Sequence, residues 1–95
     1  MITREGDRLR LEGAVTIGTV AAILTQVRAL LLPGVAVLDF KGVTEVDSAA
    51  VALALECMRE ARQRSLGLSL ANLPAAMLHL AELYAVTELL QAEPA

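Results

Sequence analysis

The chain has 95 residues, 56% of them hydrophobic, and a formal net charge of −3, which fits one small domain over residues 1–95 with a dense apolar core. It contains no basic cluster, which argues against electrostatic attraction to nucleic acid, and only two aromatic residues, which leaves little material for stacking bases on rings. We expect a soluble, cytoplasmic protein, because residues 1–6 lack the pattern of a signal peptide and no apolar run reaches the roughly 18 residues of a membrane span.

The first third of the sequence predicts a β-hairpin and a helix. Residues 2–11 contain two short strand-like segments around a turn dipeptide that begins at Gly6, and Gly13 closes the second segment. Residues 16–32 follow as a helix that Thr16 can cap and that ends before Pro33. The apolar residues of this helix recur at helical spacing and are Ile17, Val20, Ile23, Leu24, Val27, Leu30 and Leu31.

The centre of the sequence predicts a buried strand, a short loop and the first turn of a helix. Residues 35–38 form an apolar, mostly β-branched run, and residues 41–45 contain polar residues and a glycine that interrupt it. Asp47 and Ser48 then precede a long helical pattern, where a side-chain oxygen can accept a hydrogen bond from a free backbone N–H. We therefore expect Asp39, Asp47 and Ser48 to meet at the edge where α/β sheets bind ligands and partners.

A second helix is predicted over residues 48–64. Cys57 lies inside it and is expected to be a buried, unreactive thiol. Leu53 falls outside the apolar stripe, beside Ala49 and two glutamates, and is either one of the scattered exposed leucines that surfaces commonly carry or part of a contact surface. The stripe itself consists of Val51, Ala54, Leu55, Met58 and Ala61.

The last third predicts one more strand and a third helix. Residues 68–70 alternate as a short strand after Gly67, and Pro74 suits the first turn of the helix that follows. Residues 86–90 are expected to form a short terminal element, beyond which the chain frays. The order β-β-α-β-α-β-α indicates an α/β fold with a largely parallel sheet and the helices on the sheet face. The stripe of the third helix is Met77, Leu80, Ala81 and Tyr84.

The residue types needed for catalysis or metal binding are not grouped in the sequence. His79 has leucine neighbours and is expected to face solvent, and no cluster of Cys, His or carboxylates has metal-ligand spacing. The glycine patterns of phosphate-binding loops are absent, and no nucleophile-elbow pattern surrounds Ser48. We therefore expect a non-enzymatic protein without cofactor or metal.

Ser48 can be interpreted in two ways from its position alone. It is either part of a plain helix cap or a hydroxyl displayed to a partner protein, with the small side chains of Ala49, Ala50 and Ala52 allowing close approach. A phosphate on this hydroxyl would be tolerated, because the first-turn N–H groups of a helix carry a partial positive charge.

The segments L-D-F at residues 38–40 and V-D-S-A-A at residues 46–50 resemble the signature of the STAS domain family. The resemblance covers essentially the whole chain. It implies a single STAS-like α/β domain with a mixed four- to five-stranded sheet and helices packed on one face. In the anti-sigma factor antagonists of this family the position of Ser48 is a phosphorylated serine, although Ala49 and Ala50 here replace the glycine-containing pair often found after it.

Residues 72–74 and 80–90 further resemble MlaB-type STAS proteins, small cytoplasmic subunits of the Mla ABC transporter, which moves phospholipid to maintain outer-membrane lipid asymmetry. The resemblance implies a subunit that binds and regulates the ATPase and stays peripheral to the inner membrane through it. The alternative it implies is an anti-sigma factor antagonist, bound by an anti-sigma factor kinase and switched by phosphorylation of Ser48. Asp39 matches the acidic position of the strand. The partner-contact residues carried over are Asp47, Ser48, Ala49 and Ala50, with Leu53 as a neighbour.

Overall fold

Four strands and three helices follow one another along residues 1–86, the part of the chain that this computed structural model describes. Their order confirms the predicted alternation of strands and helices after an opening hairpin. The predicted terminal element at residues 86–90 lies, from residue 87 onward, outside the described residues. The elements are β1 (Ile2–Glu5), β2 (Arg8–Val15), α1 (Val20–Leu30), β3 (Val37–Val46), α2 (Ser48–Gln63), β4 (Ser69–Ala71) and α3 (Ala75–Leu83).

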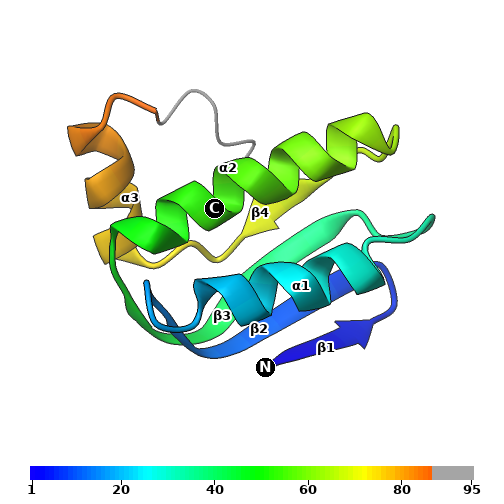
Figure 1. The fold of residues 1–95 in the computed structure, drawn as a ribbon, viewed down its shortest axis with the longest axis horizontal. Coiled ribbons are helices and arrows are strands. Elements are labelled where there is room, and N and C mark those ends of the chain that lie inside the picture. Colours follow the sequence, from blue (N-terminus) through cyan, green and yellow to red (C-terminus); the bar gives the residue numbers. More distant parts are fainter. Residues whose placement is uncertain (87–95) are drawn as a thin grey trace.

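The strands form one sheet in the order β1-β2-β3-β4. β1 and β2 pair antiparallel as the predicted hairpin, whereas β2 with β3 and β3 with β4 pair parallel. The predicted mixed sheet is therefore confirmed, with four strands among the described residues. The connections α1 and α2 lie side by side over the sheet, and α3 packs against α2 at one end of the molecule (Figure 1).

The core lies between this helix layer and the sheet. Leu9 and Leu11 of β2 and Leu38 and Phe40 of β3 are almost fully buried and alternate with residues of the opposite sheet face. Burial of each such side chain contributes about 1.5–3 kcal/mol to stability. The helices supply Ile23 and Val27 from α1, eight residues including Ala54 and Cys57 from α2, and Met77 and Ala81 from α3.

The expected break after residue 38 is wrong, because β3 continues for ten residues to Val46. The strand pairs with β2 along most of its length, with one register shift between Arg10 and Glu12 and a second between Gly13 and Ala14. Gly42 lies at this irregularity, and a Cβ there would stand only 2.8 Å from the carbonyl oxygen of Leu11. The glycine that reads as a strand breaker thus permits two strands to approach closely.

Three further expectations from helical spacing are wrong. Helix α1 begins at Val20 rather than Thr16, so Ile17 lies in the preceding loop and is 80% exposed. Leu53 is only 2% exposed and belongs to the core, whereas Tyr84, expected in the stripe of α3, is 55% exposed just after that helix ends. None of the helices within residues 1–86 has the length and apolar character needed to cross a bilayer.

Candidate functional site

The carboxylate of Asp47 joins two chain segments at the end of the sheet where β2 and β3 finish. Its Oδ1 accepts a hydrogen bond from the backbone N–H of Ala49 at 2.8 Å, which caps α2. Its Oδ2 accepts from the backbone N–H of Ile17 at 3.0 Å, which fixes the loop between β2 and α1. Asp47 therefore holds the start of α2 and this loop in one arrangement.

Ser48 is the first residue of α2 and is exposed. Among residues 1–86 its hydroxyl has no hydrogen-bond partner, because Asp47 rather than Ser48 caps the helix. The hydroxyl therefore stands at a helix start that is already ordered without it. Such a group is available to accept from or donate to another molecule, or to be modified.

The small residues that follow Ser48 are less accessible than expected. Ala49 is 9% exposed and Ala50 is fully buried, and Leu53 one turn further is 2% exposed. The burial of Leu53 has a clear cause: Arg28 of α1 pairs with Glu60 on that side of α2 at 3.1 Å, so this side faces α1 rather than solvent. Direct contact of the Ala50 and Leu53 side chains with a partner is therefore incompatible with this packing.

Asp39 does not meet Asp47 and Ser48, contrary to expectation. It is the third residue of β3, so the remaining length of the strand separates it from Asp47 by about 25 Å. It lies on the sheet face opposite Leu38 and Phe40, where it is 7% exposed. Asp39 therefore belongs to a separate cluster in the sheet.

This cluster ties β2, β3 and the residue that follows β4 together through one carboxylate. Asp39 accepts from Arg8 Nη1 at 3.1 Å, from the backbone N–H of Lys41 at 2.9 Å and from Asn72 Nδ2 at 2.9 Å. Burial raises the pKa of Asp39, but the hydrogen bonds from Asn72, Lys41 and Arg8, together with the charge of Arg8, outweigh it and the pKa is lowered. The carboxylate is thus charged and structurally engaged.

Ile17 is a residue of the site that the sequence did not reveal. Its spacing with Val20 and Leu24 fits a helical stripe, and only the position of the α1 start shows that it lies outside the helix. The available signal was Gly18, whose low helix propensity argues against a helix that begins at Thr16.

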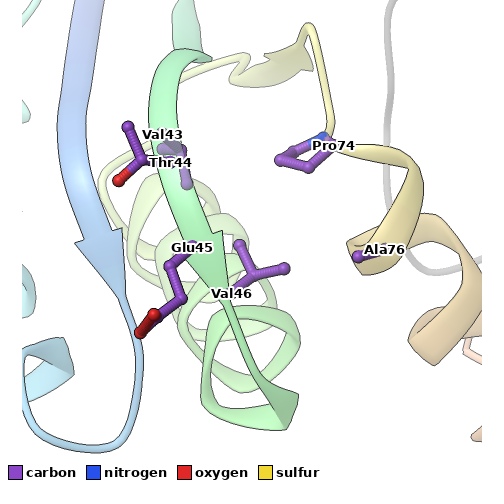
Figure 2. Close-up of a pocket in the computed structure, with 6 residues that line it drawn as sticks. All are labelled: Val43, Thr44, Glu45, Val46, Pro74 and Ala76. Carbon is purple, nitrogen blue, oxygen red and sulfur yellow. The ribbon is translucent and has the colours of Figure 1, made fainter.

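A shallow hollow of about 270 Å³ lies between the last residues of β3 and the start of α3. Figure 2 shows Val46 pointing into the space between β3 and the start of α3, where Pro74 and Ala76 face it. Glu45 is the one titratable residue among those that line it. Within residues 1–86, no group of Cys, His, Asp or Glu is arranged to hold a metal ion. The arrangement as a whole is a rigid surface with an exposed hydroxyl.

The sequence matches the family described as "Mlab, STAS domain" over residues 1–91. No curated protein matches it. Among solved structures, it is similar to the anti-sigma factor antagonist SpoIIAA in its unphosphorylated form, with a TM-score of 0.70 and 17% identity over 99% of this chain and 87% of that one.

Two further structures are similar. The Bacillus cell fate determinant SpoIIAA in its phosphorylated form has a TM-score of 0.65 and 18% identity, over 99% of this chain and 90% of that one. A sulfate transporter family protein from Wolinella succinogenes has a TM-score of 0.64 and 15% identity, over 86% of this chain and 68% of that one. At these identities the likeness shows a shared fold.

Proposed function

The chain belongs to the STAS domain family, and from this premise we propose that it is a non-enzymatic subunit that binds and regulates the ATPase of a phospholipid-transport ABC transporter. The observation that carries the proposal is the exposed Ser48 hydroxyl at the start of α2, on a surface that Asp47 keeps ordered. The Mlab description of the matched family supports this choice of partner.

In the proposed mechanism, the end of the domain that carries Ser48 docks on the ATPase as a rigid body. Because Asp47 already fixes the loop and the helix start, docking orders little additional backbone and costs little conformational entropy. Regulation requires that the domain contact the active and inactive arrangements of the ATPase differently, since equal contact shifts no equilibrium. The domain is held at the inner membrane through this partner.

Co-purification with the nucleotide-binding subunit of the transporter tests this proposal. We expect Ser48→Arg to weaken the complex at least about tenfold, because a long charged side chain at the contact prevents close approach. Gln63→Arg is the matched control, since it changes an exposed residue at the other end of the same helix, about 22 Å away. Retained binding by a folded Ser48→Arg variant would remove the proposed interface.

A second function is favoured by the same hydroxyl and by the likeness to SpoIIAA in both phosphorylation states. In this alternative the chain is an anti-sigma factor antagonist whose partner is an anti-sigma factor kinase. A phosphate on Ser48 would add about two negative charges next to Asp47, so an acidic partner surface would be repelled.

Intact-mass measurement after incubation with an anti-sigma factor kinase and ATP separates the two functions. A single phosphate that disappears in Ser48→Ala favours the phosphorylation switch. An unmodified chain that nevertheless co-purifies with the transporter ATPase favours the transporter subunit.

A further inference from the structure

Ile17 is an apolar, β-branched side chain that is 80% exposed beside the start of α2. Single exposed apolar residues are ordinary on protein surfaces, so exposure alone carries no conclusion. What distinguishes Ile17 is the order of the short loop that presents it, residues 16–19.

Hydrogen bonds hold this loop at both of its ends. The Thr19 hydroxyl donates to the carbonyl oxygen of Ala14 at 2.9 Å and accepts from the backbone N–H of Thr16 at 3.0 Å. The backbone N–H groups of Thr19 and Val20 both donate to the Thr16 carbonyl oxygen. Between these bonds, Asp47 holds the N–H of Ile17. The exposure of Ile17 is therefore a property of an ordered loop and not of a loose tip.

The loop uses the backbone of residue 17 and not its side chain. The N–H that Asp47 binds is present in every residue except proline, so a polar side chain would satisfy the same geometry. The sequence nevertheless places isoleucine at this position, where the side chain gains little burial within the domain. An apolar side chain held in a fixed position is suited to insertion into a pocket of another protein, because little freedom is lost on binding.

We propose that Ile17 is the apolar anchor of the docking surface and inserts into an apolar pocket of the partner that Ser48 contacts. This inference rests on the proposed function, because the partner is the same ATPase subunit. Asp47 connects the two contacts, since one carboxylate oxygen fixes Ile17 and the other fixes the helix that Ser48 begins. The partner therefore requires an apolar pocket for the Ile17 side chain, and next to it a polar group that hydrogen-bonds the Ser48 hydroxyl.

Affinity of purified domain variants for the transporter ATPase subunit, measured by calorimetry, tests the inference. We expect Ile17→Asp to weaken binding at least about tenfold and Ile17→Val to weaken it only severalfold, in proportion to the apolar volume removed. The matched control is Leu32→Asp, which introduces the same charge at another exposed apolar residue, 47% exposed beyond the end of α1. Thermal unfolding of each variant checks that the fold is retained.

The outcomes separate this inference from the function on which it rests. Selective loss with Ile17→Asp and wild-type binding by Leu32→Asp supports the anchor. Equal affinity of Ile17→Asp and the wild type overturns the anchor and leaves the proposed function standing. Equal losses with both aspartate variants also overturn it, because the effect is then one of added charge. A wild-type domain that does not bind the ATPase removes both the function and the anchor.

Discussion

At the scale of single residues, the two carboxylates of the candidate signature have different tasks. Asp47 stabilises the surface that carries Ser48, whereas Asp39 joins β2, β3 and the chain after β4 on the far face of the sheet. Asp39 is the buried partner of these bonds, whereas the Arg8 side chain is 39% exposed and Asn72 is exposed, so what a substitution removes is a charged acceptor inside the sheet and its hydrogen bonds. We therefore assign Asp39 a role in stability rather than in partner contact.

The pH dependence of unfolding tests this role of Asp39. Because its folded-state pKa is lowered, its contribution is complete above the ordinary value of 3.8 and is lost as the pH falls through the folded-state pKa. We expect Asp39→Asn to lower the free energy of unfolding at pH 7 by about 1–3 kcal/mol and to flatten the loss of stability in acid. Urea unfolding between pH 2 and 7, at roughly one-unit steps around the ordinary carboxyl pKa, measures both effects.

Asp7→Asn is the control, because Asp7 is exposed in the turn between β1 and β2. It should keep the wild-type dependence on pH. An acid profile of Asp39→Asn that matches that of the wild type would contradict the assignment.

Residue by residue, the sequence predicted the site only where the local pattern determines the structure. The helix start at Asp47 and Ser48 is local and was predicted correctly. The environment of Leu53 depends on α1 packing alongside α2. The spacing of residues within α2 alone does not show that contact. Ile17 was misplaced because helical spacing does not show where a helix begins.

At the scale of elements, α2 and α3 end in the same way. In each, the residue after the cap, Ser65 or Ala85, has a positive φ, and the next residue donates its N–H back to a carbonyl one turn earlier, Ala61 or Ala81. This is the pattern of a Schellman motif, in which glycine is the usual residue at the positive φ. Serine and alanine occupy that position here, so neither helix carries the usual glycine signal, although the predicted end of the second helix at residue 64 agrees with its observed cap.

Glycine at residue 65 should therefore stabilise the domain. Ser65 has φ of 57°, a left-handed conformation that costs a non-glycine residue about 1 kcal/mol. We expect Ser65→Gly to raise the free energy of unfolding by about 0.5–1 kcal/mol in a urea titration. Gln63→Gly, two residues earlier and still helical, should lower it by a similar amount, since glycine there only adds freedom to the unfolded chain.

The pairing of β2 with β3 depends on the absence of a side chain at residue 42. A Cβ there would lie 2.8 Å from the Leu11 carbonyl oxygen and 2.9 Å from Cγ of Glu12, so the strands would have to separate. We expect Gly42→Ala to destabilise the domain by about 1–3 kcal/mol, measured as the shift in the urea midpoint. Gly67→Ala is the control: no atom lies within 4 Å of a Cβ there, and it should be neutral or slightly stabilising.

The length of β3 was the largest error among the elements. Polar residues and Gly42 interrupt the apolar run, as they do in a loop, but β4 is only three residues long and pairs with β3 no further than Asp39. Beyond that point β3 has β2 alone as a neighbouring strand, and solvent reaches Lys41, Thr44 and Glu45. A run of apolar residues in the sequence indicates a buried strand. Only the first half of β3 is buried, so only that half was predicted as a strand.

At the scale of the whole molecule, one core holds all the elements, and Cys57 lies inside it. The thiol is fully buried, and burial, with a smaller effect from the nearby Glu56 carboxylate, raises its pKa to about 12. A thiol in this state is neither accessible nor ionised near neutral pH, which agrees with the expected unreactive cysteine.

The overall topology was also predicted, because alternation of strands and helices leaves few arrangements for a chain of this size.

Labelling of Cys57 consequently reports global unfolding. We expect no reaction with a thiol reagent in the folded state at pH 8 over minutes, and full reaction in denaturant. The labelling rate should rise in Gly42→Ala, which destabilises the domain, and fall in Ser65→Gly, which stabilises it, since the thiol reacts only when the core opens. Rapid labelling of the native domain, unaffected by either substitution, would show instead that α2 opens locally.

The sheet tapers along its length. At Leu9 four strands stand abreast, because Leu9 pairs with Arg4 and Leu38, and Leu38 pairs with Leu70. At Val15 and Val46, next to Asp47, only two remain. Fewer interstrand bonds protect the narrow end, so its amide protons should exchange with deuterium sooner than those at the broad end. The tapered end that carries Ser48 thus depends on the two hydrogen bonds of Asp47 more than on strand pairing, and a protein seated there would slow its exchange first.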